Sequence, residues 1–350
     1  MKPFRKNVAI AIDGGGIRGV IVTKALSILE KELGRPLHDV VRLTAGTSTG
    51  SIIAVGLASG LSAQQLYDMY LQLSGNVFKR GFRTAFWYLF NHRYDNPPLR
   101  AALQTYFGNK NVGDLWNAEP PTDIVLTTFD VVENRTRFIK SYKSEYGDWP
   151  LVKAVLASAA APTYFPSVEG QFIDGGIGSY NNPCYLAAYE VQYSLPWKPE
   201  DTTLISIGTG REKGHIKPGS VDRFLPPQYV GPLIDAFTHC AADQQVDLVT
   251  KLFTGLDFRR YQVDLRQPIP LDDTSLVQDM IVYGEQLGNM ILADQTDASM
   301  RLMPQPAPPD TARRLIPTGL ASRRQTSKTD IPRVSRPHKP ARSAPAPRKR

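Results

Sequence analysis

Cysteine and histidine are both scarce in this sequence, and their scarcity narrows the chemistry that it can carry. Its 350 residues include two cysteines, Cys184 and Cys240, and five histidines. Two widely spaced cysteines predict neither a disulfide framework nor a metal site, and they favour a reducing compartment. No cluster of metal ligands is evident either. We therefore predict a cytoplasmic protein that needs no metal ion and no organic cofactor.

Long apolar runs are missing too. No uninterrupted apolar stretch reaches the ~18 residues that a transmembrane helix needs. The first residues, MKPFRKNVAIAID, begin with positive charge, but Asp13 ends an apolar run shorter than the core of a secretory signal. The sequence therefore predicts no membrane span and no signal peptide, and it leaves peripheral contact with a membrane surface open.

Acidic residues are nearly absent from the C-terminal part of the chain. From Thr311 to Arg350, twelve Lys or Arg accompany one acidic residue, Asp330, so this part has a net charge of +11. Because the whole chain has a net charge of +8, the remaining residues together carry −3. Repeated prolines and few aliphatic residues cannot bury enough apolar surface to fold. We predict a disordered basic tail over residues 303–350, attached to one domain over residues 1–302. Such a tail suits anionic lipid or nucleic acid, or it has no fixed partner.

Strand and helix patterns alternate along the N-terminal half. Residues Val8 to Ile12 are apolar throughout, as in a strand buried on both faces. The segment VIVTKALSILEKEL then has apolar residues at helical spacing and ends at Gly34. A second strand over Val40–Ala45 and an apolar helix, SIIAVGLASG, follow. Further strands are expected in DIVLTTFDVV, RTRFIKSY, QFIDGG, TTLISIGTG and FRRYQVDL. This alternation predicts an α/β fold with a mostly parallel sheet.

A glycine loop directly follows the first strand, in NVAIAIDGGGIRG. Gly14, Gly16 and Gly19 fit the pattern G-x-G-x-x-G, which binds the pyrophosphate of a dinucleotide. A loop of exposed backbone amides also suits the oxyanion that forms during acyl transfer. The loop alone therefore leaves two classes of enzyme open, an oxidoreductase and a hydrolase.

The dinucleotide alternative lacks its second element. It needs an acidic residue at the end of the next strand, about 20 residues past the glycines. Glu30 and Glu32 fall in the expected helix instead, and the next strand ends in Gly-Thr-Ser. No G-x-x-x-x-G-K-[ST] motif indicates nucleotide hydrolysis. The oxidoreductase interpretation is therefore the weaker one.

The second glycine turn, GTSTG, carries a candidate nucleophile. Gly46 and Gly50 frame Ser48 in G-x-S-x-G, between an expected strand and an expected helix. A serine hydroxyl needs a base, and histidine is the usual one. None of the five histidines lies in a glycine-framed turn: His38, His92, His215, His239 and His338. A Ser-His-Asp triad is therefore not indicated.

A third glycine turn, FIDGG, offers a carboxylate in place of histidine. Asp174 ends an expected strand and precedes Gly175 and Gly176. An ordinary aspartate is a weak base, but partial burial raises its pKa, and a hydrogen bond would orient it toward Ser48. Asp-Gly-Gly is also a common turn sequence, which is the alternative interpretation. If the three turns share the carboxyl edge of one sheet, nucleophile, base and anion loop meet in one crevice.

The motifs DGGGIRG, GTSTG and DGG, in that order, resemble those of the patatin-like phospholipases and lipid acyl hydrolases. ASAAAPTYFP and NNP extend the resemblance, which runs from about Val8 to Gly210. It implies a three-layer α/β/α fold with a central, mainly parallel sheet, and a Ser–Asp dyad without histidine. By position, Ser48 is the implied nucleophile and Asp174 the implied base. The implied oxyanion loop comprises Gly14, Gly15, Gly16 and Arg18, with the amide of Ile17 as a further candidate donor.

These observations predict a serine acyl hydrolase for phospholipids or lysophospholipids, with no stable protein partner. The segment Val77–Tyr94 mixes Lys and Arg with aromatic residues, which favours transient contact with a membrane surface or, equally, a core helix with charged ends. One alternative is a non-catalytic, membrane-associated module that docks through the tail. Another is an enzyme regulated by a nucleotide, as in some bacterial members of the family.

Overall fold

The structure is a computed structural model that describes residues 1–78, 92–119, 121–195, 197–212, 219–224, 229 and 241–297. These residues all belong to one compact unit, Met1–Leu302. Residues 79–91, the centre of the aromatic and basic segment, and the tail over residues 303–350 lie outside the described residues. Membrane contact by the segment, disorder of the tail and the domain boundary therefore stay predictions.

Within the described residues, seven strands form one sheet with the order β4-β3-β2-β1-β6-β7, and β5 pairs with β3. Their bounds are β1 Asn7–Ile12, β2 Leu43–Gly46, β3 Asp123–Asp130, β4 Arg135–Lys140, β5 Phe172–Asp174, β6 Thr202–Ile207 and β7 Asp257–Tyr261. Strands β3, β2, β1, β6 and β7 run parallel, whereas β4 and β5 run antiparallel to β3. The expected mainly parallel sheet is confirmed.

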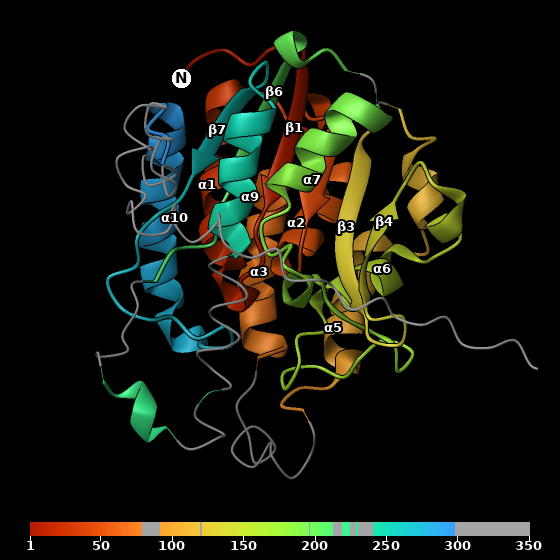
Figure 1. Ribbon diagram of the computed structural model, residues 1–350, viewed down its shortest axis with the longest axis vertical. Coiled ribbons are helices and arrows are strands. Elements are labelled where there is room, and N and C mark those ends of the chain that lie inside the picture. The colour runs from red at the N-terminus through yellow and green to blue at the C-terminus, as the bar shows by residue number, and fades with distance from the viewer. Residues whose placement is uncertain are drawn as a thin grey trace, which may run out of the picture. The chain divides into compact units, whose positions relative to one another are not determined.

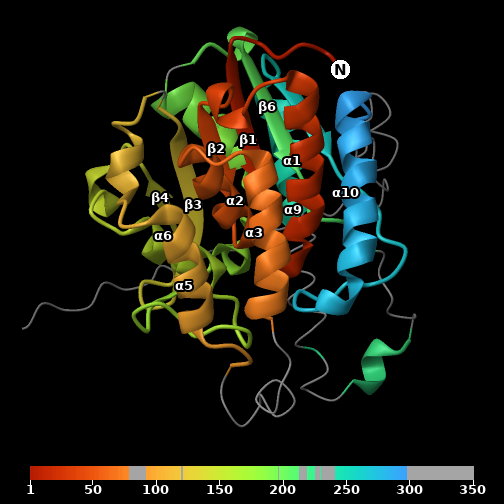
Figure 2. The ribbon, with the colours of Figure 1, turned by 180° about the vertical axis from the view of Figure 1, so that it is seen from behind.

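Helices cover both faces of this sheet. The longer ones among the described residues are α1 Gly19–Leu33, α2 Thr49–Ala58, α3 Ala63–Asn76, α5 Asn96–Phe107, α6 Leu151–Ala159, α7 Cys184–Tyr189, α9 Ala241–Leu252 and α10 Val277–Leu292. Helices α7 and α9 lie in front of the sheet in Figure 1, and α1, α3, α5 and α10 lie in front of it when it is seen from behind in Figure 2. The predicted three-layer α/β/α architecture is therefore confirmed.

The central strand β1 shows why both faces need cover. Val8, Ile10 and Ile12 pack into one apolar cluster with α1, α2, α3, α6 and α10, whereas Ala9 and Ala11 pack into a second cluster with α7 and α9. All five side chains are at most 1% exposed. A strand buried on both faces reads as an uninterrupted apolar run, which is how the sequence revealed it.

Two details differ from the sequence prediction. The second strand begins at Leu43 rather than Val40, because Leu37–Asp39 form a 3-10 turn ahead of it. The strand that carries Asp174 is antiparallel to its neighbour β3. The other two glycine turns follow parallel strands, so Asp174 reaches this part of the sheet from the opposite direction. No helix in the described part of the chain is long and apolar enough to cross a membrane.

Candidate active site

Ser48 occupies a sharp turn between β2 and α2. Its backbone has φ 54° and ψ −122°, in a region that residues with side chains rarely adopt. The flanking glycines let the chain turn this tightly: a Cβ at Gly46 would lie 2.3 Å from the carbonyl oxygen of Gly50, and one at Gly50 would lie 2.2 Å from that of Ile12. The turn therefore needs glycine on both sides of the serine.

Strand pairing brings Asp174 to the same place. Gly46, at the end of β2, pairs with Leu126 of β3, and Asp174, at the end of β5, pairs with Thr128 of the same strand. The two positions on β3 are two residues apart, which is about 7 Å along a strand. Strand β5 thus runs in from the opposite direction and ends where β2 ends. The shared neighbour β3, rather than a common parallel edge, places the aspartate beside the serine.

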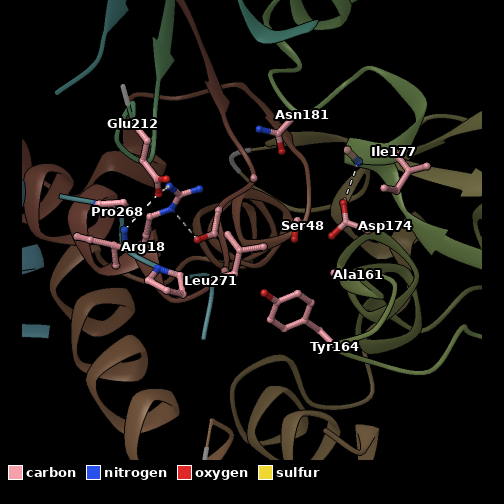
Figure 3. Close-up of a pocket in the computed structure, with 16 residues that line it drawn as sticks. Arg18, Ser48, Ala161, Tyr164, Asp174, Ile177, Asn181, Glu212, Pro268 and Leu271 are labelled. Atoms are coloured by element: carbon pink, nitrogen blue, oxygen red, sulfur yellow. Dashed lines mark hydrogen bonds and ion pairs between the residues drawn. The ribbon is translucent and has the colours of Figure 1, made fainter. Parts of the chain in front are cut away.

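The Asp174 carboxylate is buried beside Ser48. It is 6% exposed, and one of its oxygens accepts the backbone N–H of Gly176 at 2.8 Å. Burial raises the pKa of Asp174 to about 6, although the neighbouring Ser48 side chain and the hydrogen bond from the Gly176 amide act to lower it. Figure 3 shows the Ser48 side chain next to this carboxylate. The pair joins a serine hydroxyl to a carboxylate that holds its proton more firmly than an ordinary aspartate.

The glycine loop presents two backbone amides next to this pair. The amides of Gly14 and Ile17 donate to the carbonyl oxygens of Asn181 and Leu271, each at 2.9 Å. The Arg18 amide donates to Gly15 at 3.1 Å. Within the described ranges, the amides of Gly15 and Gly16 donate to no protein acceptor. Of the candidate donors, Gly14, Ile17 and Arg18 are thus engaged within the fold, and Gly15 and Gly16 remain.

Contacts from distant parts of the chain hold this loop in shape. Gly16 has φ +57°, and a Cβ there would lie 2.3 Å from the carbonyl oxygen of Leu271, so the position requires glycine. At the start of the loop, the carboxylate of Asp13 accepts two hydrogen bonds from Arg260 of β7, at 2.8 and 2.5 Å. Both side chains are buried. The bidentate ion pair fixes the point where the loop leaves β1.

Arg18 supports the loop and is itself paired. Its side chain is 6% exposed and donates to the carbonyl oxygen of Gly15 at 3.3 Å and to the Glu212 carboxylate at 2.7 Å. Figure 3 shows Arg18 directed toward Glu212. The positive charge of Arg18 is therefore balanced by Glu212.

A cavity of about 280 Å³ opens over Ser48 and Asp174. Its lining combines the glycine loop with parts of two segments that the sequence analysis quoted, Ala161 and Tyr164 of ASAAAPTYFP and Asn181 of NNP. The lining residues that the sequence did not single out are Ile177, Glu212 and the segment Pro268 to Leu271. A smaller apolar cavity of about 50 Å³ adjoins it and shares Ser48, Gly16 and Tyr164. Its remaining lining is mainly apolar: Ile52, Tyr70, Leu73, Phe78, Leu99, Ala159 and Phe165. Ser48 thus lies between a compartment of mixed polarity and an apolar one.

Histidine plays no part in this arrangement among the described residues. His38 lies 3.6 Å from Asp39, and His92 pairs with Asp95 at 3.2 Å. Neither lines the cavity over Ser48. No three His, Cys, Asp or Glu side chains in the described part of the chain lie close enough together to hold a metal ion.

Comparison with known proteins identifies the family of this chain. The family model for patatin-like phospholipases matches residues 10–188, a range that contains the glycine loop, Ser48 and Asp174. An intracellular phospholipase A2 of Caenorhabditis elegans is 32% identical over an alignment of 219 residues, which covers 58% of this chain and 19% of that protein. A cGAMP-activated phospholipase of Vibrio cholerae is 28% identical over an alignment of 242 residues, which covers 61% of this chain and 66% of that protein.

The match therefore spans less than two thirds of either relative's own length. Among solved structures, the crystal structure of VipD from Legionella pneumophila aligns with 83% of this chain and 67% of its own, with a TM-score of 0.43 and 10% sequence identity. The family match covers half of the chain and all of the residues that form the serine and aspartate turns. The chain belongs to the patatin-like phospholipase family.

Proposed function

We propose that the protein is a serine acyl hydrolase that releases fatty acids from phospholipids or lysophospholipids. The observation that carries the proposal is the placement of the Ser48 side chain next to a buried carboxylate, Asp174, in one cavity. Burial raises the pKa of Asp174 to about 6. A base is most effective when its pKa lies near the working pH. Asp174 therefore suits the part that histidine plays in other serine hydrolases.

Acylation begins with Asp174 unprotonated, its main form at neutral pH. The Ser48 hydroxyl oxygen attacks the ester carbonyl carbon, and its proton passes to the Asp174 carboxylate. The carbonyl oxygen becomes the oxyanion of a tetrahedral intermediate. When the intermediate collapses, the bond to the alkoxide breaks, Asp174 returns the proton to that oxygen, and the fatty acyl group stays on Ser48 as an ester.

The amides of Gly15 and Gly16 are the proposed donors to the oxyanion. They belong to a loop already held by the Asp13–Arg260 ion pair and by the Ile17–Leu271 hydrogen bond. Little reorganisation is needed as charge develops, which is the source of such a loop's effect on rate. Deacylation repeats the sequence with water: Asp174 takes a proton from water, hydroxide attacks the acyl-enzyme, and the fatty acid leaves as Ser48 regains a proton.

The two cavities divide the substrate between them. The apolar cavity lined by Ile52, Leu73 and Leu99 would take the acyl chain next to the ester, and the larger cavity would take the glycerol and head-group side. Because phospholipids are presented in a membrane, the enzyme would act at its surface. The basic and aromatic segment and the basic tail are the proposed points of transient contact.

The test is product analysis with phospholipid vesicles. Wild type, Ser48→Ala and Asp174→Asn are incubated with vesicles of phosphatidylglycerol and phosphatidylethanolamine, and free fatty acid and lysolipid are measured by mass spectrometry. Ser27→Ala, on α1 outside the cavity lining, is the matched control. We expect release by wild type and control, and loss of at least ~10³-fold in both site variants. Equal release by all four proteins would refute the mechanism.

The same assay addresses regulation. The Vibrio cholerae relative is named a cGAMP-activated phospholipase, so each reaction is run with and without cGAMP. If wild type releases fatty acid without the nucleotide, basal activity is established independently of regulation.

A protein lacking residues 303–350 is assayed on a short-chain nitrophenyl ester. Retained hydrolysis places the activity in the compact unit, whereas its loss favours a role for the tail beyond membrane contact.

A further inference from the structure

We propose that the C-terminal end of α6 sets the distance between Ser48 and Asp174, and that Ser158 is the positioning residue for Ser48. This inference rests on the proposed function. It assigns a role to part of the segment ASAAAPTYFP. That segment supplies neither the proposed nucleophile, nor the proposed base, nor a proposed oxyanion donor.

Two backbone groups of the reacting residues are held by the same few residues of α6. The hydroxyl oxygen of Ser158 accepts the backbone N–H of Ser48 at 3.1 Å. Two residues further on, the carbonyl oxygen of Ala160 accepts the backbone N–H of Asp174 at 3.0 Å. Ser158 and Ala160 are both at most 2% exposed. A short buried segment therefore connects the backbone of the nucleophile to the backbone of its base.

This segment is itself fixed to the sheet. The hydroxyl of Thr128 on β3 is within 2.8 Å of two carbonyl oxygens, that of Ala157 on α6 and that of Ile173 on β5. Thr128 is also the pairing partner of Asp174. The end of α6, the end of β5 and the middle of β3 thus form one hydrogen-bonded unit. Movement of α6 would change the position of Asp174 and of Ser48 together.

Ser48 needs such support because its backbone conformation is unfavourable. With φ at 54°, the backbone of Ser48 would relax to a more commonly allowed φ/ψ region unless surrounding contacts held it in place. On the carbonyl side, the hydroxyl of Ser51 donates to the Ser48 oxygen at 2.6 Å. On the amide side, Ser158 provides a side-chain acceptor from a different helix. Removing that acceptor frees the peptide to rotate, and a displacement of about 1 Å in a reacting atom can reduce the rate ~10²-fold.

The chain offers a close control for this bond. The hydroxyl oxygen of Ser141 is also buried and also accepts a backbone N–H at 3.1 Å, that of Ile124 near the start of β3. The paired variants Ser158→Ala and Ser141→Ala therefore each remove a buried hydroxyl that accepts an amide. They differ in whether that amide belongs to the nucleophile. The Ser141 hydroxyl also donates to the Asp123 carboxylate at 2.7 Å, so Ser141→Ala is the more disruptive change to the fold.

The experiment measures kcat and KM on a nitrophenyl ester, the rate of Ser48 labelling by a fluorophosphonate, and Tm. For Ser158→Ala we expect kcat and labelling to fall ~10–100-fold with KM within about twofold of wild type. For Ser141→Ala we expect kcat and labelling near wild type, whatever its Tm. Ser158→Thr keeps the accepting oxygen and is expected to recover most of the lost rate.

A pH profile separates positioning from general destabilisation. The neighbouring Ser48 side chain acts to lower the pKa of Asp174, which burial raises to about 6. Misplacing Ser48 weakens that effect, so the midpoint of kcat/KM should move to higher pH in Ser158→Ala and stay in place in Ser141→Ala.

Equal loss of kcat in the two alanine variants, or an unmoved midpoint in Ser158→Ala, would overturn the role of Ser158. If Ser158→Ala does not fold, Ser158→Cys replaces it, because a thiol is a weaker acceptor of similar shape. Wild-type kcat and labelling in the cysteine variant would then overturn the proposal. Failure of the proposed function is distinguishable, since it shows as full activity in Ser48→Ala.

Discussion

Asp174→Asn should stabilise the protein and inactivate it, with the stabilisation dependent on pH. Folding raises the pKa of this carboxyl from 3.8 to about 6, mainly because the group is desolvated. A carboxyl with a raised pKa binds its proton more tightly in the folded state. Below about pH 3.8 both states are protonated and folding carries no penalty. Above about pH 6 both states are ionised, and the full penalty opposes folding.

The size of this effect follows from the shift in pKa. A difference of about 2 pKa units means that ionised Asp174 lowers the free energy of unfolding by about 3 kcal/mol at neutral pH. An asparagine carries no charge to desolvate, and its side-chain oxygen can still accept the hydrogen bonds from Gly176 and Ser48. The variant should therefore gain about 1–3 kcal/mol at pH 7.5 and little at pH 4. Without its base, kcat should fall at least ~10³-fold.

Urea denaturation of wild type and variant at pH 4 and pH 7.5 measures the gain, and hydrolysis of a nitrophenyl ester measures the loss. Asp257→Asn is a control of opposite sign. Burial acts to raise the pKa of Asp257, but hydrogen bonds from Arg259, Lys2 and Thr203 hold it at about 2. That variant should lose stability at pH 7.5 and nearly as much at pH 4, because the folded carboxyl is ionised at both, and the loss should shrink only toward pH 2. If Asp174→Asn is less stable than wild type at pH 7.5, or if its gain is equal at both pH values, the reasoning is refuted.

Three further outcomes are expected. The kcat/KM of wild type on a neutral ester should rise with pH through a midpoint of about 6 as Asp174 loses its proton; a flat profile from pH 4.5 to 8 would contradict its role as base. Gly16→Ala should reduce kcat ~10²-fold, because φ is +57° and a Cβ would lie 2.3 Å from the Leu271 oxygen; wild-type kcat in steady-state assays would argue against the loop as oxyanion site. Leu99→Ala should enlarge the apolar cavity and shift the preference among nitrophenyl esters toward longer acyl chains, while the free energy of unfolding falls by about 2–4 kcal/mol; an unchanged chain-length profile would exclude this cavity as the acyl site.

The sequence was sufficient for the fold class because its signals are local. The apolar run of β1 and the helical spacing of α1 can each be read within 15 residues or fewer. The same holds for the G-x-S-x-G turn, where Gly46 and Gly50 are next to the serine in the chain. The fold class and the family were predicted correctly on these grounds. The catalytic roles of Ser48 and Asp174 stay predictions.

What the sequence could not supply depends on contacts between distant residues. Leu271 shapes the glycine loop through its carbonyl oxygen, which every residue type possesses, so no side-chain pattern marks it. Arg260 pairs with Asp13 across 247 positions of the chain. Strand β5 has three residues, and its antiparallel direction is set by pairing with β3 rather than by its own pattern. These features arise only when residues far apart in the sequence come into contact in the folded protein.

Two energetically unfavourable features, at Ser48 and Asp174, lie side by side in the lining of one cavity. The backbone of Ser48 adopts a conformation that costs roughly 1–3 kcal/mol. Asp174, which lines the same cavity, is buried against the preference of a charged carboxylate. Neither feature is needed to complete the sheet, since an ordinary turn could connect β2 to α2 and an apolar residue could end β5. Such costs are opposed here by hydrogen bonds from α6, and they border the larger of the two cavities at Ser48. Stability alone would favour the removal of both features, so their presence in the lining of one cavity supports the proposal that the fold keeps them for chemistry.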